Sequence, residues 1–94
     1  MQVPELTSFY MRVSDDNRVT TTHISLYMAL FELWNERTFL NPVLVTRRRL
    51  MDMAKISGIA TYHKCIRDLH DFGYVLYMPS RNPGINSQVC MMAL

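Results

Sequence analysis

The sequence predicts a mainly α-helical fold that carries a small β-hairpin. Apolar residues recur at helical spacing in four separate segments, and two short strand-like runs flank a turn-rich tip at residues 79–86. Ninety-four residues with 49% hydrophobic content are enough for one core and leave no room for a second. We therefore expect a single domain over residues 1–94, in the order helix, helix, strand, helix, helix, strand, strand.

The first predicted helix covers about residues 4–14, because Pro4 suits a first helical turn and an amphipathic spacing follows it. The apolar positions of this spacing are Leu6, Phe9, Tyr10 and Val13. The polar stretch Ser14-Asp15-Asp16-Asn17 ends the helix. This helix either packs on the rest of the domain or supports a dimer interface.

The second predicted helix covers about residues 22–37, with an N-cap from the run Thr20-Thr21-Thr22. It is apolar on two sides, formed by Ile24, Tyr27, Met28, Phe31 and Trp34 and by Leu26, Leu30 and Leu33. Such a helix must be covered, since burial of each side chain is worth roughly 1.5–3 kcal/mol. One side should meet the later helices, and the other the N-terminal helix, a second subunit or both. From this excess of apolar surface we predict a homodimer.

A helix–turn–helix pattern is predicted at residues 46–73, directly after a short strand at Val43-Leu44-Val45. Its first helix covers about residues 47–55, with Thr46 as N-cap and Leu50, Met53 and Ala54 inside. Its second helix covers about residues 59–72, with Ser57 or Gly58 as N-cap and Gly73 in the left-handed conformation that closes a helix. At about 100° per residue, the inner side of this helix holds Ile59, Tyr62, Ile66 and Leu69.

Two strands at about residues 74–78 and 87–92 follow, joined by the tip at residues 79–86. Arg81, Asn82 and Asn86 lie near this tip. A hairpin of this kind can reach a minor groove or a backbone phosphate, and a plain solvated loop is the alternative.

The segment from residue 21 to residue 92 resembles the winged helix-turn-helix family of DNA-binding proteins. The resemblance rests on a small residue in the first helix, a short turn, a recognition helix and a glycine-aliphatic entry to the wing. These positions are Leu50, Ala54, Ile56, the run Ala60-Thr61-Tyr62-His63-Lys64, Ile66, Leu69 and the exit Gly73-Tyr74-Val75. It implies a recognition helix at residues 59–72, a hairpin wing at residues 74–92 and double-stranded DNA as partner.

The outward side of the predicted recognition helix is polarised along its length. Its first half offers Thr61, His63, Lys64 and Arg67, and its second half offers Asp68 and Asp71. This polarity suits a helix whose first turns enter a DNA groove. We therefore predict that Thr61, His63, Lys64 and Arg67 face bases or phosphates.

Three consecutive arginines, Arg47, Arg48 and Arg49, occupy the first turn of the preceding helix. The helix dipole disfavours each cation there by roughly 0.3–1 kcal/mol, and a bound phosphate would reverse that sign. We predict that these arginines, along with Arg81 and Asn82 of the wing, hold the phosphate backbone of the DNA. A solvated basic turn paired with distant acids is the alternative.

The charge of the chain is unevenly distributed. Residues 1–40 hold three basic and five acidic residues, a net charge of −2, whereas residues 46–71 hold six basic and three acidic residues, a net charge of +3. The basic residues thus gather where the helical pattern already suggests DNA binding. The modest excess predicts salt-sensitive binding of moderate affinity.

Other functions find little support in the sequence. The three histidines and the two cysteines lack metal-ligand spacing, so we expect neither metal nor cofactor. No nucleophile with a base partner, glycine-rich phosphate loop or paired carboxylates appears, so we expect no enzyme and no small-molecule ligand. No apolar run approaches the roughly 18 residues of a membrane span, and no secretory signal opens the chain, so we expect a cytoplasmic protein with reduced cysteines.

The sequence therefore predicts a sequence-specific DNA-binding protein, a small transcriptional regulator of bacterial type. In the general character of its sequence, the chain also resembles small winged-helix proteins of bacterial mobile elements. The alternatives are a winged-helix module that binds protein and a replication-initiation accessory domain without a gene-regulatory role.

Overall fold

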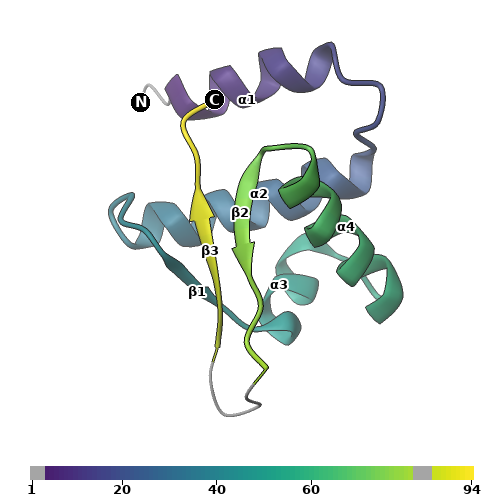
Figure 1. Ribbon diagram of the computed structural model, residues 1–94, viewed down its shortest axis with the longest axis vertical. Helices are drawn as coiled ribbons and strands as arrows, with labels where there is room; N and C mark the ends of the chain where they lie inside the picture. The colour runs from purple at the N-terminus through teal and green to yellow at the C-terminus, as the bar shows by residue number, and fades with distance from the viewer. Residues whose placement is uncertain (1–3, 82–85) are drawn as a thin grey trace.

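The computed structural model describes residues 4–81 and 86–94. This part of the chain forms four helices and a three-stranded antiparallel sheet (Figure 1). The elements in chain order are α1 (Pro4–Ser14), α2 (Thr21–Glu36), β1 (Val43–Val45), α3 (Arg47–Ala54), α4 (Ile59–Asp71), β2 (Val75–Met78) and β3 (Ser87–Met91). The predicted order of helices and strands is confirmed, and each end lies within one residue of its predicted position.

The ends of α3 and α4 show why these segments stop where they do. Thr46 caps α3, because its side-chain oxygen accepts a hydrogen bond of 3.2 Å from the Arg49 N–H. Of the two candidate caps of α4, the structure places Gly58 at the N-cap. Gly73 follows α4 with φ at +86°, the left-handed conformation predicted for it. The start of α3 and both ends of α4 are therefore set by local sequence.

The sheet joins a strand from before α3 to the hairpin at the end of the chain. β3 lies in the middle, with β1 and β2 on either side, and Val89 is paired with Val43 and Tyr77. The Asn41 side chain extends the β1–β3 pairing, because its amide donates to the Met91 carbonyl and accepts from the Met91 N–H, both at 2.9 Å. The sheet thus ties residues before the helix pair to residues after it.

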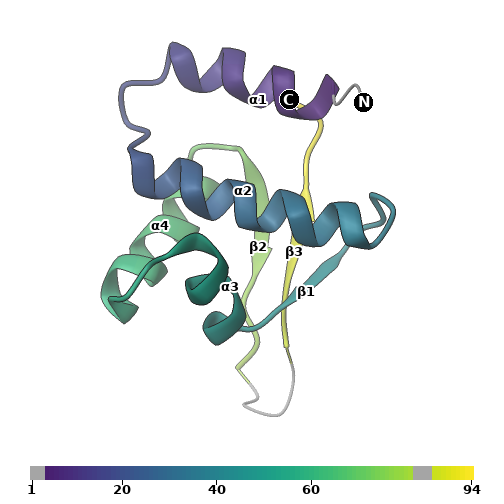
Figure 2. The ribbon, with the colours of Figure 1, turned by 180° about the vertical axis from the view of Figure 1, so that it is seen from behind.

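The core lies between the sheet and α2, which crosses behind the strands in Figure 1 and in front of them in Figure 2. Leu26, Tyr27 and Leu30 of α2 are fully buried, and so is Val89 of the central strand. α3 and α4 pack against the same helix from below, through side chains such as Leu50 and Ile66. Burial of each large apolar side chain is worth roughly 1.5–3 kcal/mol. The helix against which all these elements pack, α2, is therefore the main source of hydrophobic stabilisation.

α1 covers the remaining side of α2 and runs alongside it (Figures 1 and 2). The Phe9 ring stacks on the Tyr27 ring with centroids 3.6 Å apart and meets the Tyr74 ring edge-on at 5.7 Å. The apolar sides of α2 are therefore covered largely within one chain. The homodimer no longer follows from this helix, and it remains a prediction.

Three residues predicted to lie on covered helix sides are exposed: Tyr10 (71%), Met28 (41%) and Ile59. Ile59 is 51% exposed, although its helical spacing places it above Tyr62 and Ile66. The reason is its place at the first position of α4, since helical side chains tilt toward the N-terminus of their helix. Its side chain therefore points past the end of the core rather than into it.

Within residues 4–81 and 86–94, no helix combines the length and the apolar character needed to cross a membrane.

Candidate nucleic-acid interface

The exposed side of α4 carries four of the predicted site residues. On the inner side of the helix, Tyr62, Ile66 and Leu69 are at most 2% exposed. The outer side is formed by the exposed residues Thr61, His63, Lys64 and Arg67. The Lys64 side chain is 72% exposed, so no other described part of the chain covers it. The inward and outward sides predicted from helical spacing are confirmed for these seven residues.

The three arginines at the start of α3 are all exposed, but they do not point the same way. Arg47 lies beside α4 and the β2–β3 hairpin, where it lines a cleft. Arg49 turns toward the end of α2, and its guanidinium lies 3.2 Å from the Glu36 carboxylate. The structure therefore brings Arg47 to the exposed side of α4. Arg49 instead has a distant acidic partner, which agrees with the alternative of a basic turn paired with distant acids.

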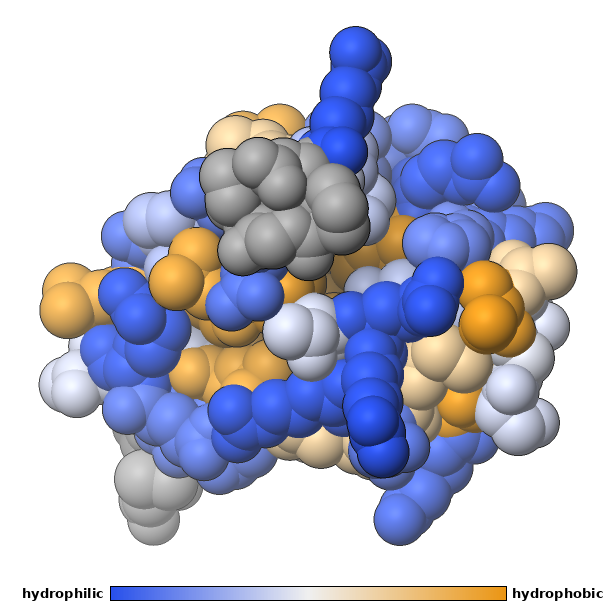
Figure 3. All heavy atoms as spheres, turned by 90° about the horizontal axis from the view of Figure 1, so that it is seen from below, coloured by the Kyte–Doolittle hydropathy of each residue, from blue (hydrophilic) through white to orange (hydrophobic). Residues whose placement is uncertain are grey.

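A cleft of about 400 Å³ opens between α3, α4 and the hairpin. We call it the basic cleft; it is lined by Arg47, Tyr62, His63, Arg67, Tyr77, Pro79, Ser80 and Ser87. Figure 3 looks onto this end of the molecule, where hydrophilic side chains surround smaller apolar areas beside the hairpin tip. The cleft thus brings three predicted site residues together with both strands of the hairpin.

The cations at this end differ in whether an acid neutralises them. Lys64 is paired with Asp68, one turn further along α4, at 2.8 Å. Arg47 and Arg67 have no acidic partner within the described residues, and none of the described residues that line the basic cleft is acidic. Among the described residues, the positive charge of the cleft is therefore left without an acidic partner.

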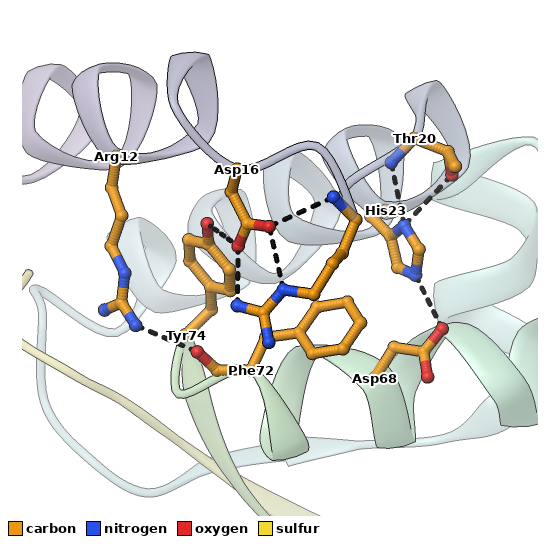
Figure 4. A network of polar contacts seen from close by, with 8 residues as sticks. Arg12, Asp16, Thr20, His23, Asp68, Phe72 and Tyr74 are labelled. Carbon is orange, nitrogen blue, oxygen red and sulfur yellow. Dashed lines mark hydrogen bonds and ion pairs between the residues drawn. The ribbon is translucent and has the colours of Figure 1, made fainter.

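The Asp68 carboxylate joins α4 to the start of α2 (Figure 4). Its Oδ2 atom accepts from Lys64 Nζ at 2.8 Å and lies 2.9 Å from Nε2 of His23, which is buried. Nδ1 of His23 in turn accepts from the Thr20 N–H at 2.9 Å. The bond from Lys64, followed by that from His23, holds the pKa of Asp68 below its usual range, so the carboxylate stays ionised.

The far end of α4 is held in place by a second group of polar contacts (Figure 4). Arg12 of α1 donates to the Phe72 carbonyl at 2.9 Å and to the Gly73 carbonyl at 3.2 Å. The Tyr74 hydroxyl donates to the Asp16 carboxylate at 2.8 Å. Arg18 forms an ion pair with the same carboxylate at 2.9 Å and is the main reason that the pKa of Asp16 is lowered. α4 is thus anchored at its C-terminal end and exposed at its N-terminal end.

Of the two predicted site residues on the hairpin, one lies within the described residues. Arg81 is exposed and directly follows Ser80, which lines the basic cleft. Asn82, the other predicted site residue of the hairpin, lies outside the described residues.

The chain was compared with known proteins on three levels. No model of a known protein family matches it, and neither a curated protein nor a solved structure does so.

Five residues of the basic cleft were not predicted as site residues: Tyr62, Tyr77, Pro79, Ser80 and Ser87. Tyr62 was assigned to the core, where its ring is indeed buried, and burial raises the pKa of its hydroxyl to about 12, with a smaller opposite effect of Arg47. Tyr77 and Ser87 lie on the side of the sheet that faces the helices, at its lower end. Strand alternation predicts that side, but not that the helices leave it partly open there.

Among the residues that the structure places, no group of three or more histidine, cysteine, aspartate or glutamate side chains could hold a metal ion.

Proposed function

We propose that this chain is a winged helix-turn-helix protein that binds double-stranded DNA and reads its sequence, as a small transcriptional regulator without enzymatic activity. The order of α2, β1, α3, α4, β2 and β3 supports this fold assignment. The single observation that carries the functional proposal is the uncompensated positive charge of the basic cleft, directly beside the exposed side of α4.

The proposed mechanism is positioning by phosphates followed by readout of base edges. The first turns of α4 enter the major groove, where Thr61 and His63 reach base edges and Lys64 reaches a base or a phosphate. Arg47 and Arg48 hold the backbone beside the groove, and Arg81 follows the neighbouring strand. Arg49 contributes less, because its ion pair with Glu36 must open before it can reach a phosphate.

The experiment selects bound fragments from random duplex DNA and then measures affinity for the selected site by fluorescence anisotropy at several salt concentrations. We expect affinity to fall steeply with salt, since each neutralised phosphate adds about 0.9 to the slope of log affinity against log salt. Replacing Lys64 and Arg67 together with alanine should reduce that slope by about one to two and abolish binding at physiological salt.

Arg37→Ala is the matched control, because Arg37 is an exposed arginine at the opposite end of α2 from α4. It removes a positive charge away from α4 and the basic cleft, so the affinity of this variant should stay near that of the wild type. Absence of salt-dependent binding by the wild-type protein to any mixed duplex at low salt would refute the proposal.

An apolar side of the sheet favours a second candidate, a protein-interaction module or replication-initiation accessory domain. Leu44, Leu76 and Met78 are 36–49% exposed, and the strand register places them on the side facing away from the helices (Figure 1). A protein partner or a second copy of the chain would cover such a surface. Light scattering at micromolar concentration tests the homodimer directly, and a dimer that lacks affinity for DNA would favour this second candidate.

A further inference from the structure

The basic cleft has a composition that goes beyond general attraction to DNA. Two guanidinium groups, those of Arg47 and Arg67, reach it from different helices, and His63 lies on the same side of α4. Neither arginine has an acidic partner within the described residues, whereas Arg18, Arg49 and Lys64 each have one. Arginines left unpaired around a cleft favour an anion that accepts hydrogen bonds from both.

The uncharged groups of the cleft are also suited to donate. Ser87 Oγ accepts from the Ser80 N–H at 3.1 Å, which leaves the hydroxyl proton of Ser87 available for another acceptor. The described lining thus offers several donors and no carboxylate.

We propose that the basic cleft is a binding site for a phosphate ester, with Arg47 and Arg67 as its principal ligands. The volume of about 400 Å³ exceeds the needs of a bare anion and falls in the range of sites for small organic ligands. A phosphate together with the sugar attached to it therefore fits the cleft better than inorganic phosphate alone. The partly exposed ring of Tyr77 provides an apolar wall for the sugar.

Two sources of this phosphate ester share the same chemistry. One is the backbone of a DNA strand that passes between α4 and the hairpin, and in this form the inference rests on the proposed function. The other is a free nucleotide, which would compete with DNA for the same arginines. In both cases the cleft recognises a phosphate through arginine donors and selects against ligands that carry no negative charge.

The first measurement is a ligand titration followed by NMR, using the backbone amides and the arginine Nε–H signals. The probes are inorganic phosphate, the dinucleotide TpT and the mononucleotide dTMP, with sodium chloride at matched ionic strength as control. We expect TpT or dTMP to shift the signals of Arg47, Arg67 and Ser87 at lower concentration than inorganic phosphate does. Shifts no larger than those caused by sodium chloride, for all three probes, would overturn the proposal.

The second measurement is duplex affinity of Arg47→Ala and Arg67→Ala, with Arg37→Ala as the control for charge. Each of the first two changes should weaken binding roughly tenfold, since a hydrogen bond between charged groups is lost. Both arginines are exposed, so their removal should not prevent folding, and thermal unfolding of each variant verifies this. Arg67→Lys should recover only part of the affinity, because lysine keeps the charge and loses the planar fork.

The outcomes separate the cleft from the proposed function. Duplex binding that is lowered by both alanine changes assigns the cleft to backbone phosphate. Shifts by dTMP without any duplex binding would end the proposed DNA function and keep the site, with a free nucleotide as its ligand. Duplex binding by the wild type that neither alanine change weakens more than Arg37→Ala does would end the backbone assignment and leave DNA binding intact.

Discussion

Replacing Asp68 with alanine should destabilise the protein through His23 rather than through Lys64. Both side chains bond to the same carboxylate oxygen, His23 Nε2 at 2.9 Å and Lys64 Nζ at 2.8 Å. Because His23 Nδ1 accepts from the Thr20 N–H, the ring proton lies on Nε2 and is donated to Asp68. His23 is only 3% exposed, so water cannot readily replace the lost acceptor.

The size of the effect follows from these exposures. A buried donor left without a partner costs about 1–3 kcal/mol. The pair with Lys64 adds only about 0.3–0.5 kcal/mol, since that side chain is 72% exposed and lies one helical turn away. The better helix propensity of alanine returns roughly 0.5 kcal/mol. We therefore expect Asp68→Ala to lower the free energy of unfolding by about 1–3 kcal/mol, and Lys64→Ala to change it by no more than about 0.5 kcal/mol.

Urea unfolding followed by fluorescence of the single tryptophan, Trp34, measures both changes. This residue is 7% exposed in the core, so its emission should report global unfolding. Asp68→Asn is the matched variant, because it keeps an acceptor oxygen for His23 and should lose less stability than Asp68→Ala. Equal shifts of the urea midpoint for Asp68→Ala and Lys64→Ala would refute the reasoning, since the bond to His23 would then contribute nothing.

Three further predictions concern the contacts that anchor the end of α4. Tyr74→Phe removes the hydrogen bond to Asp16 and should cost about 0.5–1.5 kcal/mol in urea unfolding; an unchanged midpoint would contradict it. Gly73→Ala should cost about 1–2 kcal/mol because φ is +86°, and most of this cost should persist when Arg12, whose guanidinium lies 3.0 Å from the added methyl group, is also replaced by alanine. Stability should fall as the pH drops below about 4. The pKa values of Asp16 and Asp68 are lower in the folded protein than in the unfolded chain, where the value is about 3.9. Their contribution to stability is therefore present above about pH 3.9 and is lost as the pH falls toward the folded pKa values. Urea midpoints that stay constant between pH 7 and pH 3 would contradict this last prediction.

Local features of the chain were enough to predict its helices, its strands and the two sides of α4. Tyr62, Ile66 and Leu69 return to one side of a helix because the turn has 3.6 residues, and this spacing does not depend on any distant segment. The caps at Thr46 and Gly73 are equally local, since they depend on one side chain and one backbone angle. Such features need only the neighbouring residues to be recognised.

Contacts between distant segments lay outside the reach of that reasoning. Helical spacing predicts that the side chains of Arg47 and Arg49 point in different directions. It does not predict that Glu36 lies next to Arg49 and an open cleft next to Arg47. The link from His23 to Asp68 spans 45 positions, and the pattern of neither helix reveals it. These pairings arise only when the helices pack, because packing determines which polar groups lose water and must find partners.

The amino-acid order alone therefore specified where α4 lies and which of its side chains face outward. It also indicated that basic residues gather on residues 46–71. Lys64 has its acidic partner one turn along the same helix, a spacing that the sequence itself contains, whereas folding gave Arg49 the distant Glu36 and left Arg47 and Arg67 without an acidic partner among the described residues. The physical reason is that helical periodicity is a property of neighbouring residues, whereas charge compensation depends on distances across the folded chain.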